Sequence, residues 1–271
     1  MVRSESMSTE LGRLTRPAPG RAQYLATVGR QLYCVTHAAT GDARARVLLL
    51  GPLGSERTYA YNTSVRWART LADGGFDVVR FDYRGFGEST GSSAEASLHD
   101  LLDDAHAAVD LLDGEGPLIV HGLRFGALVA EGLRRRGVGD ALLVWGRPHR
   151  AEDGLLDLLR NHLAAEAVVA TAHRHGAIDA MVAELEAGRA VDAEGFAISP
   201  RLWHDLKVVE LASADAPTVR HLDLSTGPGQ PGIRIPRPPF WRPGQVLRPD
   251  LDELFRISLA WLEEVADTLR R

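Results

Sequence analysis

The chain has 271 residues, of which 45% are hydrophobic and 25% are charged, a balance typical of a globular protein with a sizeable core. No apolar run reaches the roughly eighteen residues of a membrane helix, and the start lacks the apolar stretch of a secretion signal. We therefore expect a cytoplasmic protein with no membrane span. The formal net charge of −5 gives no indication that nucleic acid is the principal partner, because nucleic-acid-binding proteins carry a basic surface. The single cysteine, Cys34, excludes an internal disulfide and a cysteine metal site.

The first part of the chain predicts a leader, a hairpin and a buried strand. Residues 1–20 carry no periodic apolar pattern and are predicted to be a flexible leader. The segments Tyr24–Val28 and Gln31–Thr36 lie on either side of Gly29, which is typical of a tight β-hairpin. The continuous apolar run Arg46–Leu50 predicts a strand covered on both faces, as in a parallel sheet.

Strands and helices alternate over the next hundred residues. The apolar spacing predicts helices over Thr63–Asp73, from a capping box at Ser97 and Asp100 to about Leu112, and over Phe125–Arg136. Short apolar runs predict strands at Asp77–Phe81, Pro117–Val120 and Ala141–Trp145. This alternation predicts the α/β class, with a mostly parallel, doubly wound sheet.

The pattern changes after residue 146. We expect residues 147–216 to form a mainly helical cap over a core made of residues 21–146 and 217–271. The segments in chain order are two cap helices at Leu155–Ala170 and Ala177–Gly188, a strand at Thr218–Leu224, a proline-rich loop at Gly227–Pro249, and a terminal helix with an apolar face from Leu251 to Leu269. No buried strand is expected inside the cap.

The most informative segment is the strand-to-helix junction at Leu118–Ala127, LIVHGLRFGA. It has the form of a nucleophile elbow, G-x-S-x-G, in which the glycines permit a sharp turn that exposes the central residue. Here the central residue is Arg124. The loop Gly51–Gly54 follows an earlier strand, where an oxyanion loop belongs, and DYRGFGEST begins at Asp82. These motifs resemble the α/β-hydrolase family over roughly Arg46–Trp145, and the resemblance implies an α/β-hydrolase fold.

A narrower resemblance concerns the elbow itself. GLRFGA, with arginine at the nucleophile position, is similar to the G-L-R-L-G-A elbows of exosortase-system-associated hydrolases. The late Pro-Pro-Phe-Trp at Pro238–Trp241 also resembles that group. The resemblance implies a role in bacterial envelope or exopolysaccharide biology and leaves the activity open.

The serine-hydrolase triad is incomplete. Such an enzyme needs a hydroxyl at the elbow, an acid after a later strand and a histidine after the last strand. Arg124 cannot be a nucleophile, because a guanidinium stays protonated at any working pH. His221 is the last histidine, and Phe240–Arg242 stand where the catalytic one would lie. Asp223 has the position of the acid but no partner to orient. Because loss of nucleophile and base together costs on the order of a million-fold, ordinary triad hydrolysis is not expected.

The elbow nevertheless predicts an anion site. A helix N-terminus favours an anion, and arginine adds a fork of donors suited to carboxylate or phosphate. We expect Arg124 to anchor a small anionic or acylated ligand, with help from the backbone amides of Leu53 and Phe125. The loop containing Arg147 and His149 would add positive charge at the same rim. The pair Phe240 and Trp241 would either line the pocket mouth or plug it.

Three alternatives remain open. Arg124 can instead form a buried ion pair with a carboxylate such as Glu88, Glu152 or Asp223. The chain can be an enzyme of another class that uses His121, Arg124 and backbone amides, or it can be an interaction scaffold with a protein partner or a second copy. A scaffold predicts a filled cavity and a paired Arg124, a binder predicts an open basic cavity, and an enzyme predicts a titrating group in that cavity. No cofactor or metal is implied.

Overall fold

The computed structural model describes residues 20–170, 176–211, 216–227, 229–245 and 247–271. The leader predicted for residues 1–20 therefore lies outside the described residues, except for Gly20. No helix in these described ranges is both long enough and apolar enough to cross a membrane.

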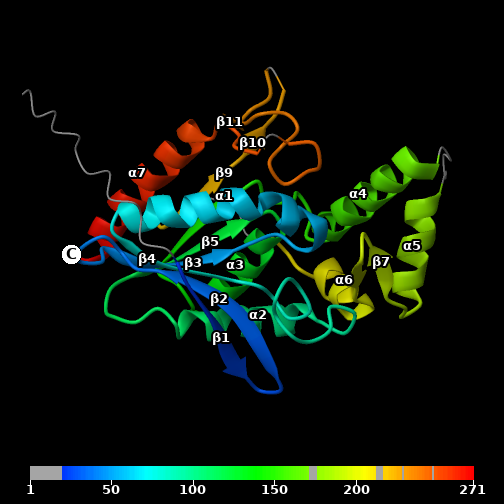
Figure 1. Ribbon diagram of the computed structural model, residues 1–271, viewed down its shortest axis with the longest axis horizontal. Coiled ribbons are helices and arrows are strands. Elements are labelled where there is room, and N and C mark those ends of the chain that lie inside the picture. Colours follow the sequence, from blue (N-terminus) through cyan, green and yellow to red (C-terminus); the bar gives the residue numbers. More distant parts are fainter. Residues whose placement is uncertain (1–19, 171–175, 212–215, 228, 246) are drawn as a thin grey trace, which may run out of the picture.

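A seven-stranded sheet forms the centre of the molecule (Figure 1). Its order is β1-β2-β4-β3-β5-β6-β9. The strands are β1 (Arg21–Thr27), β2 (Arg30–His37), β3 (Ala45–Leu50), β4 (Phe76–Phe81), β5 (Leu118–Leu123), β6 (Ala141–Trp145) and β9 (Val219–Leu222). The β1–β2 hairpin is antiparallel and joins β4 antiparallel, whereas β4, β3, β5, β6 and β9 run parallel. The predicted fold class, a mostly parallel α/β sheet, is confirmed.

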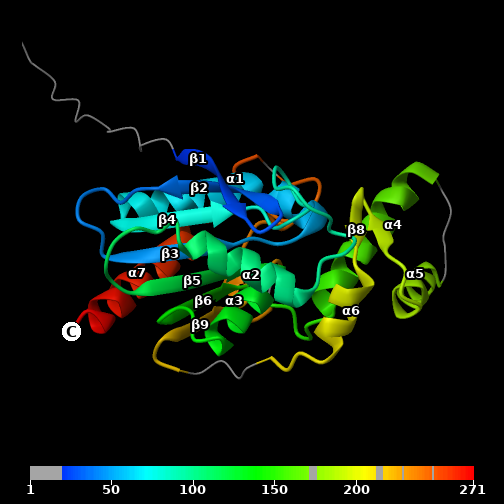
Figure 2. The same ribbon diagram turned by 90° about the horizontal axis from the view of Figure 1, so that it is seen from below.

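Helices cover both faces of the sheet (Figures 1 and 2). The helices α1 (Gly54–Asp73) and α7 (Asp252–Leu269) pack on one face, and α2 (Leu98–Val109) and α3 (Phe125–Arg135) pack on the other. Alternate residues of the buried strands therefore enter two separate cores, one on each face. The predicted capping box is present, since Ser97 and Asp100 exchange hydrogen bonds at the start of α2.

The segment between β6 and β9 lies beyond the carboxyl ends of the parallel strands (Figure 2). It contains α4 (Asp153–Ala170), α5 (Ala177–Glu186), a hairpin of β7 (Val191–Ala193) and β8 (Phe196–Ile198), and α6 (Pro200–Lys207). The two predicted helices are present. The sequence predicted no buried strand here, and the structure adds a short, partly buried hairpin. Strands of three residues are too short to produce an alternating pattern that can be recognised in the sequence.

Two other predicted boundaries differ from the structure. The first helix begins at Gly54 rather than Thr63. The apolar spacing did not reveal this start, because polar Ser55 and Glu56 occupy buried positions in the first turn. The strand predicted over Thr218–Leu224 ends at Leu222. After Asp223 the chain forms β10 (Leu224–Ser225), which pairs in parallel with β11 (Ile233–Arg234) inside the proline-rich loop.

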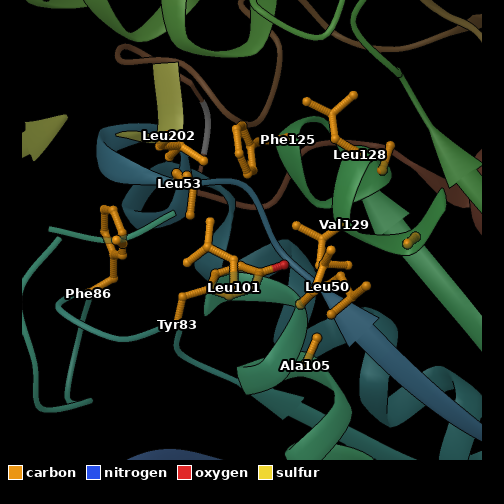
Figure 3. Close-up of a cluster of buried hydrophobic side chains, with 14 of the residues drawn as sticks. Leu50, Leu53, Tyr83, Phe86, Leu101, Ala105, Phe125, Leu128, Val129 and Leu202 are labelled. Atoms are coloured by element: carbon orange, nitrogen blue, oxygen red, sulfur yellow. The ribbon is translucent and has the colours of Figure 1, made fainter. Parts of the chain in front are cut away.

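The core on the α2–α3 face continues into the segment after β6 (Figure 3). Leu53 at the start of α1 and Phe125 at the start of α3 are each 1% exposed and belong to this cluster. Leu202 of α6 joins them. The two helix N-termini that flank the elbow are therefore held by apolar contacts from three elements.

Candidate functional site

The elbow has the sharp geometry that its sequence predicts. Arg124 lies between β5 and α3 with φ 55° and ψ −119°, a conformation that a side chain other than glycine rarely adopts. Its backbone N–H donates to the carbonyl of Trp145 at 3.0 Å, and its carbonyl accepts from Ala127 N–H at 3.0 Å. These bonds fix the strained turn between β6 and the first turn of α3.

The two elbow glycines permit close approach of backbones. A Cβ atom on Gly126 would lie 2.0 Å from the carbonyl oxygen of Leu50, and one on Gly122 would lie 2.5 Å from Cα of Ala127. Both distances are shorter than any side chain can accept. The turn that exposes Arg124 therefore depends on glycine at both positions.

The guanidinium of Arg124 is bound by two carboxylates from different elements. Its Nε donates to Glu56 Oε2 at 3.3 Å and its Nη2 to Glu56 Oε1 at 3.2 Å, a two-point contact with α1. Nη2 also donates to Asp157 Oδ2 of α4 at 2.5 Å. The ring of Trp241 completes the site, with its centroid 5.3 Å from Cζ of Arg124.

The three charged groups differ in exposure and in the shifts of their pKa values. The side chains of Glu56, Arg124 and Asp157 are 2%, 11% and 21% exposed. Burial raises the pKa of Glu56 above its usual value, and Arg124 opposes that rise. Burial alone would raise the pKa of Asp157, but the charge and hydrogen bond of Arg124 hold it below the usual value. Burial would likewise lower the pKa of Arg124, but the two carboxylates raise it, so the guanidinium stays charged.

The carboxylate partners differ from those named by sequence reasoning. The structure pairs Arg124 with Glu56 and Asp157 rather than with Glu88, Glu152 or Asp223. Glu56 follows the oxyanion loop by two residues, and this short spacing was a usable signal. Asp157 carries no comparable signal, because a single aspartate on a cap helix reads as an ordinary solvated residue.

Arg124 forms part of the wall of a cavity of about 530 Å³. The cavity lies beyond the carboxyl ends of β5, β6 and β9, where open α/β sheets hold their ligands. Its charged lining is balanced, with Arg124, Arg147 and Arg160 facing Asp153, Asp157 and Asp223. The loop with Arg147 and His149 does line the cavity, as expected, but three carboxylates balance its positive charge. The remaining lining includes Pro148, His149, Leu224, Pro231 and Trp241.

The other predicted ligand-binding residues fall into two groups. Arg147, His149 and Trp241 line the cavity together with Arg124. Arg147 also donates to Glu131 of α3 at 2.6 Å. Leu53 and Phe125 do not line the cavity in the described part of the chain, because their side chains lie in the core (Figure 3). For these two residues the prediction concerns backbone amides at helix N-termini, and they do occupy such positions.

His121 is separate from this site. It lies on β5 and is 3% exposed, and it lines a different cavity on the α1 face of the sheet. Its ring packs edge-on against Trp145, with centroids 4.5 Å apart. Burial lowers its pKa to about 3, so the ring is neutral at physiological pH.

Asp223, the residue at the position of a triad acid, lies between β9 and β10 rather than in the middle of a strand. Its carbonyl accepts from Ile233 N–H at 2.8 Å, and the residue lines the Arg124 cavity. Phe240 and Trp241, which the sequence suggested at the position of a triad histidine, are 1% and 7% exposed and pack edge to face.

Comparison with known proteins supports the fold. The family model Hydrolase_4, described as serine aminopeptidase S33, matches residues 55–136, which include the elbow. No curated protein matches the chain. A putative hydrolase from Agrobacterium vitis S4 is similar in structure, with a TM-score of 0.52 and 19% identity over 77% of this chain and 79% of that one. Est1E from Butyrivibrio proteoclasticus, solved with ferulic acid, has a TM-score of 0.59 and 14% identity over 90% of this chain and 98% of that one.

At these identities the two structures are evidence for the fold alone. The matched family model, the strand order and the glycine-dependent elbow agree with one another. On this evidence the chain has the α/β-hydrolase fold, and its residues 55–136 are similar to the Hydrolase_4 family.

Proposed function

We propose that this chain is a non-hydrolytic member of the superfamily that binds a small anionic or acylated molecule in the cavity at Arg124. The observation that carries the proposal is the placement of a charged guanidinium on the elbow, in the wall of a cavity of about 530 Å³. That volume falls within the range of about 300–1,000 Å³ typical of small-molecule sites. Arg124 cannot act as a nucleophile, and no histidine follows His221 in the sequence.

The two carboxylates at Arg124 have different roles in this proposal. Glu56 is almost fully buried and is absent from the cavity lining in the described residues, so it neutralises the inner side of the guanidinium. Asp157 lines the cavity and is 21% exposed. A ligand carboxylate or phosphate can therefore take the place of Asp157 on Arg124 while Glu56 stays bound.

A displaced Asp157 would keep a cationic partner. Its Oδ1 already accepts from Arg160 Nη1 at 2.8 Å, so its charge does not become unpaired when a ligand binds. This matters because a buried charge that loses its partner is costly. Asp157 is, on this view, an internal competitor that sets the affinity for anions.

The apolar part of the lining favours an organic ligand over an inorganic ion. Pro148, Leu224, Pro231 and Trp241 form this part of the cavity. Such side chains suit a short acyl group attached to the anion, since burial of apolar surface adds to affinity. The elbow's resemblance to exosortase-associated proteins supports placing that ligand in cytoplasmic steps of bacterial envelope polysaccharide or lipid metabolism.

Calorimetric titration with carboxylates of increasing chain length tests the binding site. We expect acetate, butyrate and octanoate to bind more tightly in that order, and butyramide, which lacks the charge, to bind more weakly than butyrate. The variant Asp157→Asn should bind butyrate about tenfold more tightly, because one charged hydrogen bond to Arg124 no longer competes. Arg124→Ala should lose binding.

Asp153→Asn is the matched control, because Asp153 lines the same cavity and its side chain accepts from Arg150 N–H rather than from Arg124. It should not reproduce the gain of Asp157→Asn. Failure of both the wild type and a folded Asp157→Asn to bind any carboxylate would reject the proposal. The Arg124 cluster would then be a structural ion-pair network, as expected for a scaffold.

Turnover of chromogenic acyl and phosphate esters tests the non-hydrolytic part of the proposal. We expect no turnover by the wild type, Arg124→Ala or His121→Ala. Turnover that either substitution abolishes would instead support an enzyme of another class. The separation of His121 and Arg124 into different cavities and the low pKa of His121 do not favour that alternative.

A further inference from the structure

A second cavity lies between the sheet and α1, the helix that runs across this face in Figure 1. Its volume is about 50 Å³. Trp67 from α1, Arg80 from β4 and His121 from β5 are among its lining residues. In the described part of the chain it shares no lining residue with the Arg124 cavity, so it requires its own explanation.

Three nitrogen atoms of the lining residues are buried and lack a hydrogen-bond partner among the described residues. They are Trp67 Nε1, His121 Nε2 and Arg80 Nε. Trp67 and His121 are 1% and 3% exposed, and their ring centroids are 6.1 Å apart. A buried polar atom without a partner costs about 1–3 kcal/mol, and native proteins leave few of them. Their concentration around one cavity points to a bound polar group.

The chemistry of these atoms defines the group. The indole Nε1–H and the guanidinium Nε–H are donors. The His121 ring is neutral, because burial lowers its pKa, and Nε2 is its buried nitrogen without a partner in the described ranges. A neutral imidazole that donates through Nδ1 presents a lone pair at Nε2. The cavity therefore offers both donors and an acceptor.

A hydroxyl group satisfies both kinds of atom, because it donates one hydrogen bond and accepts two. An ionised carboxylate has no proton to give to Nε2. Asp82 on the rim is already paired with Arg57, whose Nε lies 2.9 Å from Oδ1, and the three buried nitrogen atoms remain without a partner within the part of the chain that the structure describes. A cation would leave the indole N–H without an acceptor.

The size and the walls of the cavity limit the ligand further. A cavity needs about 10–15 Å³ to hold one water molecule, and a cavity that holds benzene has about 150 Å³. At about 50 Å³, this cavity is too small for an aromatic molecule. Leu49, Leu123 and Trp145 provide apolar walls. Tyr61 also lines the cavity and is 38% exposed, which gives a route to the surface.

We propose that the cavity beneath α1 is a binding site for a neutral hydroxylic molecule of about three to five heavy atoms, such as a short-chain alcohol or diol. Its hydroxyl donates to His121 Nε2 and accepts from Trp67 Nε1–H; the centroids of these two rings are 6.1 Å apart. Its carbon atoms contact the apolar walls.

Nuclear magnetic resonance of the tryptophan indole groups tests this directly on the full chain. The Trp67 Nε1–H signal is assigned as the one missing from Trp67→Phe. We expect 1-propanol and 1,2-propanediol to move this signal along a saturable curve, whereas formate at matched ionic strength should not. The Trp203 Nε1–H donates to Glu186 at 2.8 Å and serves as the internal control, with no saturable change.

The variant His121→Leu removes the acceptor, and we expect it to weaken the propanol response about tenfold, the equivalent of one hydrogen bond. His106→Leu, on the exposed surface of α2, is the matched control. If His121→Leu does not fold, Trp67→Phe should abolish the protection against thermal unfolding that 1,2-propanediol gives to the wild type.

Three outcomes would overturn the proposal. A linear shift shared by Trp67 and Trp203 would show a solvent effect, and saturation by formate but not propanol would show an anion site. A nuclear Overhauser contact between Trp67 Nε1–H and water, with no response to either alcohol, would show a hydrated cavity that excludes ligands.

Discussion

Glu56 Oε1 lies 3.2 Å from Nη2 of Arg124, so a buried carboxylate of α1 neutralises the cation that stands at the nucleophile position of the elbow. The two residues are 68 positions apart. Their contact ties the first turn of α1 to the strained turn between β5 and α3. The strained turn of the elbow therefore holds an ion-paired arginine at its centre.

The Glu56–Arg124 pair is expected to matter for stability. Glu56→Gln should lower the free energy of unfolding by about 3 kcal/mol, because removal of one partner leaves a buried charge poorly compensated. Urea denaturation measures the change. The exposed Glu88 provides the matched variant, Glu88→Gln, which should stay within about 0.5 kcal/mol of the wild type. Equal effects of the two substitutions would contradict a role for the Glu56 contact.

The close backbone approach at Gly126 gives a second prediction. Gly126→Ala should destabilise the protein by at least about 3 kcal/mol, because its Cβ would meet the Leu50 carbonyl oxygen at 2.0 Å. Gly51→Ala is the control, since its Cβ would meet nothing within 4 Å, and it should be neutral or slightly stabilising. A stable Gly126→Ala protein would show that the elbow can relax.

Restoring a serine should not restore a hydrolase. Arg124→Ser places a hydroxyl on the elbow, but the chain has no histidine after His221 to activate it. We expect no burst of nitrophenolate from p-nitrophenyl acetate and a steady rate within about threefold of Arg124→Ala, since both lack a working triad. An acyl-enzyme adduct on residue 124, detected by mass spectrometry, would refute this expectation.

His121 should make stability depend on pH. Its pKa is lowered to about 3 in the folded protein, from 6.5, so between these values the unfolded chain binds a proton that the folded chain does not. Stability therefore rises with pH in this window, by up to about 1.4 kcal/mol per pH unit from this residue, and the gain is complete above pH 6.5.

Urea titrations at intervals from pH 5 to 6.5 measure that slope. His121→Leu should reduce this slope by the equivalent of close to one bound proton. His106→Leu, at an exposed position, should leave the slope unchanged. The same slope in the wild type and in His121→Leu would mean that the ring is protonated within the fold.

Local sequence was sufficient to locate the elbow. The order strand, Gly-x-Arg-x-Gly, helix predicts a sharp turn, because each glycine and each apolar run acts through its immediate neighbours. The capping box at Ser97 and Asp100 was predictable for the same reason. Glu56 and Asp157 were not predicted as partners of Arg124, because their contacts join residues 68 and 33 positions apart and leave no periodic signal.

The sequence by itself determined the α/β class with a mostly parallel sheet. It also showed that the elbow carries arginine instead of serine and that no histidine follows His221, since these points follow from periodicity and residue identity. The tertiary structure alone decided that Arg124 is neutralised by carboxylates from α1 and α4, and that His121 and Arg124 line different cavities. The physical reason is that alternate side chains of a strand point to opposite faces, while the partners on each face come from helices whose positions depend on packing of the whole chain.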